Sequence, residues 1–146
     1  MQMDGTIQGI KFSYFGYYYS DKSGSTQLLV YTASNLADKY KIEIENFLNV
    51  EKIEGKGIDS LYQQQQIYVK GRTGGERCKP FGRNKSQKLK KLFQEYEIPL
   101  WQRDRLPLIY IGGKLAAVGD LWVCEEFHAQ PNKQGISINW TDNLTI

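Results

Sequence analysis

The chain has 146 residues, of which 40% are hydrophobic and 24% are charged, and its formal net charge is +3. This composition is typical of a globular protein, and we expect one domain over residues 1–146. No run of about 18 apolar residues, the length of a membrane helix, occurs, and the first residues lack the basic and then apolar segments of a secretory signal. We therefore expect a soluble, cytoplasmic protein with no membrane partner.

Residues 1–61, the first part of the chain, are rich in residues that favour β-strands. Strands are predicted over residues 10–20, 27–34 and 40–50, with polar or glycine-containing turns between them. The first of these strands holds a cluster of tyrosines, namely Tyr14, Tyr17, Tyr18 and Tyr19. The cluster could stack on nucleic-acid bases, but we expect core packing, because aromatic residues are common in buried strands.

The second part, residues 62–130, contains the main predicted helix, at about residues 86–97. Its apolar residues follow the i, i+3, i+4, i+7 spacing of a single helical face: Leu89, Leu92, Phe93 and Tyr96. Asn84 or Ser86 is expected to cap the start of the helix, and Pro99 is expected to end it. The helix would then pack with one side and present Lys88, Lys90 and Lys91 on the other.

The remaining elements are predicted strands. Residues 67–70 form a short one, and two apolar runs around Gly112 and Gly113 predict a buried β-hairpin with a tight turn. The third part, residues 131–146, is a tail or a last strand over residues 136–140. The predicted fold is therefore α+β and β-rich, with mostly antiparallel strands and one main amphipathic helix.

The sequence contains no recognisable catalytic or metal-binding group. Cys78 and Cys124 belong to no CxxC pair, and we expect both to be reduced and structural. His128 is the only histidine, and we expect a surface or half-buried side chain, because a zinc site or a catalytic triad would need further ligands or partners. Gly74 and Gly75 lack the following GK[ST] of a phosphate-binding loop and are interpreted as a turn. No catalytic, metal-binding or cofactor-binding residue is predicted.

Positive charge is concentrated between Lys70 and Arg105. This stretch holds eleven Lys and Arg and four acids, a net charge of +7, which leaves −4 for the rest of the chain. Such asymmetry is typical of nucleic-acid binding. Two interpretations remain open at its end. Either Arg103 or Arg105 binds a phosphate while Trp101 stacks beside it, or Asp104 pairs with an arginine and Trp101 closes the core.

Residues in this basic stretch resemble the C-terminal domain of bacterial tRNA(Ile)-lysidine synthetases. The elements that carry the resemblance are the GGE at 74–76, the GR at 82–83, KLKKLFQE at 88–95, Pro99, Trp101, the RDR at 103–105, the PL at 107–108 and LAAV at 115–118. The clear match covers roughly residues 68–127, and residues 1–61 fit the preceding β segment in character only. The resemblance implies a three-layer PheT/TilS-like fold, shared with part of the phenylalanyl-tRNA synthetase β subunit.

The family ligates lysine to the wobble cytidine of a minor isoleucine tRNA after ATP has activated the base as an adenylate. That chemistry belongs to an N-terminal PP-loop domain with an SGGxDS-type motif, whereas residues 23–25 read SGS and lack the rest of it. The resemblance therefore implies a noncatalytic fragment of a tRNA-modifying ligase. ATP, lysine and a magnesium ion are expected only for the parent enzyme. The implied partners are tRNA(Ile) with the CAU anticodon and the other domains of the enzyme, with no DNA.

The resemblance implies that the chain binds tRNA away from the anticodon, at the acceptor stem. We expect phosphate contacts there, since A-form stems present shape, phosphates and 2′-hydroxyls to a protein. The expected contact residues are Arg72, Arg77, Lys79, Arg83, Lys88, Lys90, Lys91, Arg103 and Arg105. In the alternative hypothesis, the same basic face packs on the rest of the enzyme and positions its domains. Charge composition alone does not separate the two.

Overall fold

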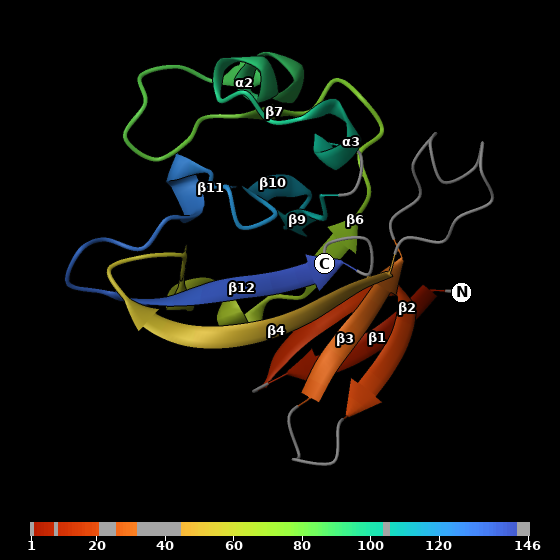
Figure 1. Cartoon of the computed structure of the whole chain (residues 1–146). Helices are drawn as coiled ribbons and strands as arrows, with labels where there is room; N and C mark the ends of the chain where they lie inside the picture. Colours follow the sequence, from red (N-terminus) through yellow and green to blue (C-terminus); the bar gives the residue numbers. More distant parts are fainter. Residues whose placement is uncertain (1, 8, 21–25, 32–44, 104–105, 143–146) are drawn as a thin grey trace.

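The structure is a computed structural model, and it describes residues 2–7, 9–20, 26–31, 45–103 and 106–142 (Figure 1). Strands dominate the described part of the chain. Their bounds are β1 (Gln2–Ile7), β2 (Ile10–Ser20), β3 (Thr26–Tyr31), β4 (Glu45–Glu54), β5 (Ile58–Asp59), β6 (Ile67–Lys70), β7 (Arg77–Cys78), β8 (Gln87–Lys88), β9 (Leu108–Ile111), β10 (Lys114–Val118), β11 (Trp122–Val123) and β12 (Gln134–Asp142). The helices are α2 (Leu89–Glu95) and α3 (Leu100–Arg103), with short 3₁₀ turns η1 (Ser60–Gln64) and η2 (Glu125–Phe127).

One large sheet runs in the order β11-β10-β9-β6-β2-β3-β4-β12-β5, and β1 pairs with β2 outside this path. Strand β2 joins the two halves of the sheet, because Phe12 pairs with Ile67 of β6 while residues 16–20 pair with β3. The β2–β6 pair is parallel and the other described pairs are antiparallel. The predicted α+β, β-rich fold with mostly antiparallel strands is confirmed.

The predicted strands agree with the structure wherever it describes them. Strand β2 covers the whole predicted range of residues 10–20, and β6 matches residues 67–70. Strand β4 continues to Glu54, four residues beyond its predicted end. The end of the predicted second strand and the start of the third, residues 32–44, lie outside the described residues, as do the side chains of the tyrosine cluster in β2.

The hairpin and the last strand are also confirmed. Gly112 and Gly113 connect β9 to β10 with φ angles of 60° and 79°, the left-handed conformation that a tight hairpin turn requires. Strand β12 is longer than predicted because it pairs along β4 from Gln134 to Asp142. Figure 1 shows β12 lying beside β4, with the β9–β10 hairpin and α2 above it.

The main helix begins later than predicted. Residues 87 and 88 are extended and pair with β7, and the Leu89 N–H donates to the Glu76 carbonyl at 2.9 Å. Lys88 occupies the N-cap position without a side-chain hydrogen bond, so the predicted capping by Asn84 or Ser86 is wrong. A backbone carbonyl of the preceding segment, rather than a capping side chain, therefore accepts the hydrogen bond of the first N–H of α2.

The end of α2 also differs from the prediction. Glu97 has a φ of 55°, and the Ile98 N–H donates to the Phe93 carbonyl at 2.9 Å, which forms a Schellman motif two residues before Pro99. The Pro99 carbonyl instead accepts the first backbone bonds of α3, from Gln102 and Arg103. Pro99 therefore starts α3, and the left-handed Glu97 ends α2.

Helix α2 packs on the sheet through the predicted apolar face. Leu89, Leu92 and Phe93 are at most 1% exposed, whereas Tyr96 is 44% exposed and lies at the edge of that face. They join the strand residues of one core that includes Val69, and burying each large apolar side chain contributes about 1.5–3 kcal/mol. No helix of the described residues is long and apolar enough to cross a membrane.

Candidate functional site

The lysines at the start of α2 are the predicted site residues that face solvent most clearly. Lys88, Lys90 and Lys91 are exposed, and within the described part of the chain no hydrogen bond or ion pair engages their ammonium groups. We call these three the α2 lysines. The first turn of α2 contains no acid, and Glu95 in its last turn forms its ion pair with Arg83. The charge of the α2 lysines is available to a partner.

The segment before α2, residues 77–83, carries further predicted cations, and we call it the 77–83 loop. Lys79 forms an ion pair with Glu125 at 2.6 Å. Arg77 donates to the Ser86 carbonyl at 3.0 Å through Nη2. These predicted contact residues already have partners in the protein.

Arg83 is the most fully engaged cation of the 77–83 loop. Its guanidinium donates to Glu95 Oε1 at 2.7 Å and to the Tyr96 hydroxyl at 2.8 Å. The hydrogen bond to Glu95 is the main reason that the pKa of Arg83 is raised. Arg83 therefore ties the 77–83 loop to the end of α2.

Arg72 precedes α2 in the sequence and Arg103 follows it, but both guanidinium groups lie near the ring of Phe93. Their guanidinium carbons lie 5.0 Å and 5.9 Å from the centre of the Phe93 ring. The Arg103 Nε–H also donates to the Ile98 carbonyl at 2.7 Å, and both side chains are half-buried. Their described contacts hold α2 in place. Arg105 and Asp104, the other charged residues of the RDR motif, lie outside the described residues.

Gly74 and Gly75 form the predicted bend, with φ angles of 109° and 80°. The carboxylate of Glu76 closes it by accepting the Thr73 N–H at 2.7 Å and the Gly74 N–H at 3.0 Å. Partial burial alone would raise the pKa of Glu76, but these hydrogen bonds outweigh burial and lower it. The bend leads from β6 into β7, which do not pair with each other, so it is not a simple hairpin turn.

Trp101 is 63% exposed and Leu100 is 74% exposed, so together they form an apolar projection on α3. The interpretation in which Trp101 closes the core is wrong. The side chain was ambiguous in the sequence because α3 is a single turn, too short for a periodic pattern to assign its faces. The projection is available for contact with a partner.

Two exposed features were missed as site residues. Lys85 is exposed and lies three residues before Lys88 in the sequence. On β6, the Lys70 ammonium lies 5.9 Å from the centre of the Tyr68 ring and 4.9 Å from that of Tyr110. The alternation of β6, with Ile67 and Val69 buried, was the signal that could have placed Tyr68 and Lys70 on the outer face.

The cysteines and the histidine occupy structural positions. Cys78 and Cys124 are free and buried. A hydrogen bond with Cys78 and burial raise the pKa of Cys124, which keeps it in the unreactive thiol form. His128 is half-buried, and its Nδ1 donates to the Ala129 carbonyl at 2.6 Å. Among the described residues no three His, Cys, Asp or Glu side chains are grouped as a metal site would require.

Comparisons with known proteins single out one family. Residues 67–140 match the family model described as the TilS substrate C-terminal domain. A tRNA(Ile)-lysidine synthase from Coxiella burnetii is 47% identical over 91 residues, which is 62% of this chain and 20% of that protein. A tRNA(Ile)-lysidine synthase from Methylococcus capsulatus is 42% identical over 89 residues, which is 60% of this chain and 20% of that protein.

The chain thus spans about a fifth of the length of the curated relatives it matches. A crystal structure of a TilS C-terminal domain is 23% identical, covering 67% of this chain and 85% of the other with a TM-score of 0.42. The family-model match begins at β6 and ends in β12, so it contains α2, the 77–83 loop and the hairpin.

Proposed function

This chain belongs to the TilS substrate C-terminal domain family, and from that membership we propose that it is the noncatalytic docking domain of a tRNA(Ile)-lysidine synthase. It binds the acceptor stem of the tRNA by phosphate contacts. Another domain of the same cytoplasmic enzyme then ligates lysine to the wobble cytidine with ATP and a magnesium ion. The substrate is tRNA(Ile) with the CAU anticodon.

The observation that carries the proposal is the state of the α2 lysines. Three cations lie at the positive end of the helix dipole, and the first turn of the helix holds no acid to compensate them. Positive charges at this end of a helix destabilise it, so the three lysines do not contribute to folding and are explained by a partner that they bind. RNA phosphates are the partners that such a group of lysines would neutralise.

The binding surface is smaller than the charge count suggested. Arg83 and Lys79 pair with acids, and Arg103 is held against Phe93 and Ile98. We place the primary phosphate contacts on the α2 lysines, with Lys85 beside them. Arg77 and Arg72 can contribute only by giving up or sharing their present contacts.

The proposal is tested by the binding of the chain to an acceptor-stem RNA hairpin at several salt concentrations. Each phosphate contact contributes about −0.9 to the slope of log K against log salt. Replacing the α2 lysines by alanine, as Lys88→Ala, Lys90→Ala and Lys91→Ala together, should flatten the slope by about 3. Fluorescence anisotropy of a labelled hairpin measures both affinity and slope.

A matched control removes the same charge elsewhere. Lys11, Lys52 and Lys133 are exposed and lie outside the basic stretch, and their replacement by alanine should change the slope by much less. Equal slopes for the two triple variants would contradict the proposal, because net charge alone would then explain binding.

The exposed pair Leu100 and Trp101 favours a second candidate function, an interaction module that packs on another domain of the enzyme. In that case Trp101→Ala would weaken lysidine formation by the whole synthase while leaving hairpin affinity unchanged. The two functions are therefore separable by measuring both quantities in the Trp101→Ala and α2 lysine variants.

A further inference from the structure

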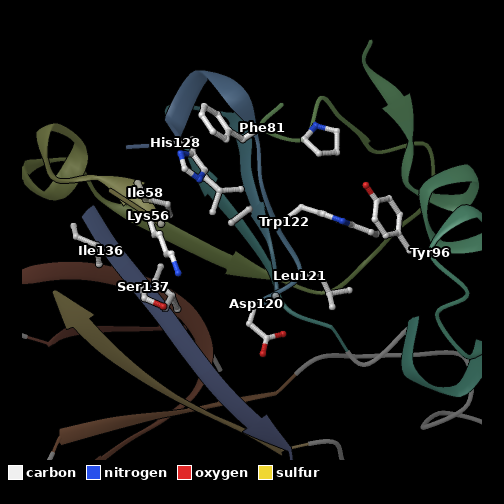
Figure 2. Close-up of a pocket in the computed structure, with 16 residues that line it drawn as sticks. Lys56, Ile58, Phe81, Tyr96, Asp120, Leu121, Trp122, His128, Ile136 and Ser137 are labelled. Atoms are coloured by element: carbon white, nitrogen blue, oxygen red, sulfur yellow. The ribbon is translucent and has the colours of Figure 1, made fainter. Parts of the chain in front are cut away.

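A cavity of about 450 Å³ lies between the 77–83 loop, β11 and the strands β5 and β12 (Figure 2). Its volume falls within the range of about 300–1,000 Å³ that is common for small-molecule sites. The small residues Ala117 and Gly119 are among those that line it, which leaves the space open. None of the predicted contact residues that the structure describes lines this cavity.

Aromatic rings form two sides of the cavity. Phe81 and His128 are stacked with their centres 3.8 Å apart and an angle of 8° between the rings. Trp122 lies edge-on to Tyr96 with centres 5.1 Å apart, and Figure 2 shows these two on the side opposite Phe81 and His128. Phe81 is 45% exposed, so it can accept a further flat ring.

The backbone holds Phe81 in position. The Arg83 N–H donates to the Pro80 carbonyl at 3.0 Å, and Gly82 has a φ of 87°, as in a type II turn. The Phe81 N–H donates to the Val123 carbonyl at 3.2 Å. Because the turn is fixed in this way, little ordering is needed when a ligand stacks on the ring.

Polar groups of both signs also line the cavity. Lys56, Asp120 and Ser137 are among its lining residues, and no ion pair among the described residues engages Lys56 or Asp120. Lys56 and Asp120 are exposed. An ammonium group can bind a phosphate, and a carboxylate can accept hydrogen bonds from the exocyclic amine of a base.

An unpaired nucleotide fits this combination better than a base pair within a stem. Its base offers a flat face to the aromatic side chains and a free edge to Asp120, while its phosphate offers charge to Lys56. In a stem, by contrast, neighbouring bases cover the faces of each base, and its pairing edge is occupied by the partner base. Tyr96, the C-cap residue of α2, also lines the cavity, so the helix that carries the α2 lysines ends at the cavity wall.

We propose that the cavity between Phe81, Trp122 and Lys56 binds an unpaired nucleotide of the RNA, with its base stacked on an aromatic side chain. The inference rests on the proposed RNA-docking function and adds a site that reads the single-stranded part of the substrate. The stem contacts provide salt-dependent affinity, and the cavity provides stacking on one extruded base.

The test uses His128 as a reporter, because it is the only histidine of the chain and its ring protons give unique NMR signals. A short single-stranded oligoribonucleotide, titrated at constant pH, should shift these signals through the ring current of the stacked base. The same backbone with abasic sugars should not. Phe81→Ala should weaken binding of the normal oligonucleotide about tenfold, whereas Phe81→Tyr should retain it.

Leu61→Ala is the matched control, because Leu61 is 77% exposed and does not line the cavity. Its affinity for the oligonucleotide should equal that of the unchanged chain. An unshifted His128 signal, equal binding of the abasic strand, or unchanged affinity in Phe81→Ala would each overturn the inference.

The outcome also separates this inference from the docking function. Salt-dependent hairpin binding together with a silent His128 signal would leave the docking function standing and remove the cavity site. Oligonucleotide binding that depends on Phe81, without any hairpin binding, would keep the cavity and remove the stem-docking proposal.

Discussion

The α2 lysines and the cations of the 77–83 loop have the same charge but different surroundings. The α2 lysines project from the first turn of a helix whose other side is buried, and no described acid pairs with them. Lys79 and Arg83 are held by Glu125 and Glu95. Although both groups raise the positive charge of the same stretch, acids already neutralise Lys79 and Arg83, whereas no described acid neutralises the α2 lysines. Charge density therefore does not by itself define a binding surface.

The difference arises because an ion pair joins residues that are close in space. Glu125, the partner of Lys79, lies outside the stretch from Lys70 to Arg105. A charge count within that stretch therefore overestimates the cations that remain available. Glu95 lies inside it, but its choice of Arg83 over the neighbouring lysines depends on how the 77–83 loop folds back on the end of α2.

Phe93 anchors α2 in the core. Removing its ring should disturb the helix and so abolish the difference in surroundings between the α2 lysines and the cations of the 77–83 loop. Phe93 is fully buried and contacts the guanidinium groups of Arg72 and Arg103. We expect Phe93→Ala to lower the free energy of unfolding by about 3–5 kcal/mol, the usual cost of emptying a core aromatic site. Chemical denaturation measures the change. Phe81→Ala removes an exposed ring and should cost far less, and equal losses would show that Phe93 is not an anchor.

Releasing one paired cation should make it behave like an α2 lysine. In Glu95→Gln, Arg83 loses its ion pair and the local negative charge falls by one. We expect tighter hairpin binding and a slope of log K against log salt that is steeper by about 1. The double variant Glu95→Gln with Arg83→Ala should lose the additional slope. If Glu95→Gln alone leaves the slope unchanged, then pairing is not what separates the two groups of cations.

The bend that precedes the 77–83 loop should give a smaller, pH-dependent effect. Hydrogen bonds lower the pKa of Glu76 from its ordinary value of 4.5. Their stabilisation is therefore complete above pH 4.5 and is lost as the pH falls through the lower, native pKa. Because Glu76 is only partly buried and solvent screens its charge, we expect less than about 1 kcal/mol. Denaturation at neutral and acidic pH should show a weaker pH dependence in Glu76→Gln than in the unchanged chain or in Glu97→Gln.

Much of the fold could be predicted from local patterns. The spacing of Leu89, Leu92 and Phe93 identified the buried face of α2, and Gly112 with Gly113 identified the hairpin. The ends of α2 could not be predicted in this way. Residues 87 and 88 pair with β7, and the left-handed Glu97 ends the helix before Pro99 is reached. Both features depend on hydrogen bonds to other parts of the backbone.

The candidate site was only partly predictable for the same reason. Wheel geometry placed Lys91 on the outer side of the helix, where it is exposed. It gave no information on Arg103, whose half-buried guanidinium lies against Phe93, or on the exposed Trp101. The cavity at Phe81 and Trp122 was missed, because its walls come from loop and strand residues that are far apart along the chain.

The sequence by itself determined the strand-rich class, the apolar face of the main helix, the hairpin turn and the resemblance to the family, since each depends on neighbouring residues or on short spacings. The tertiary structure alone decided which cations are paired, which aromatic rings are exposed and where a cavity opens. Those outcomes depend on distances across the fold, and electrostatic and stacking interactions act over a few ångströms in space, whatever the separation along the chain.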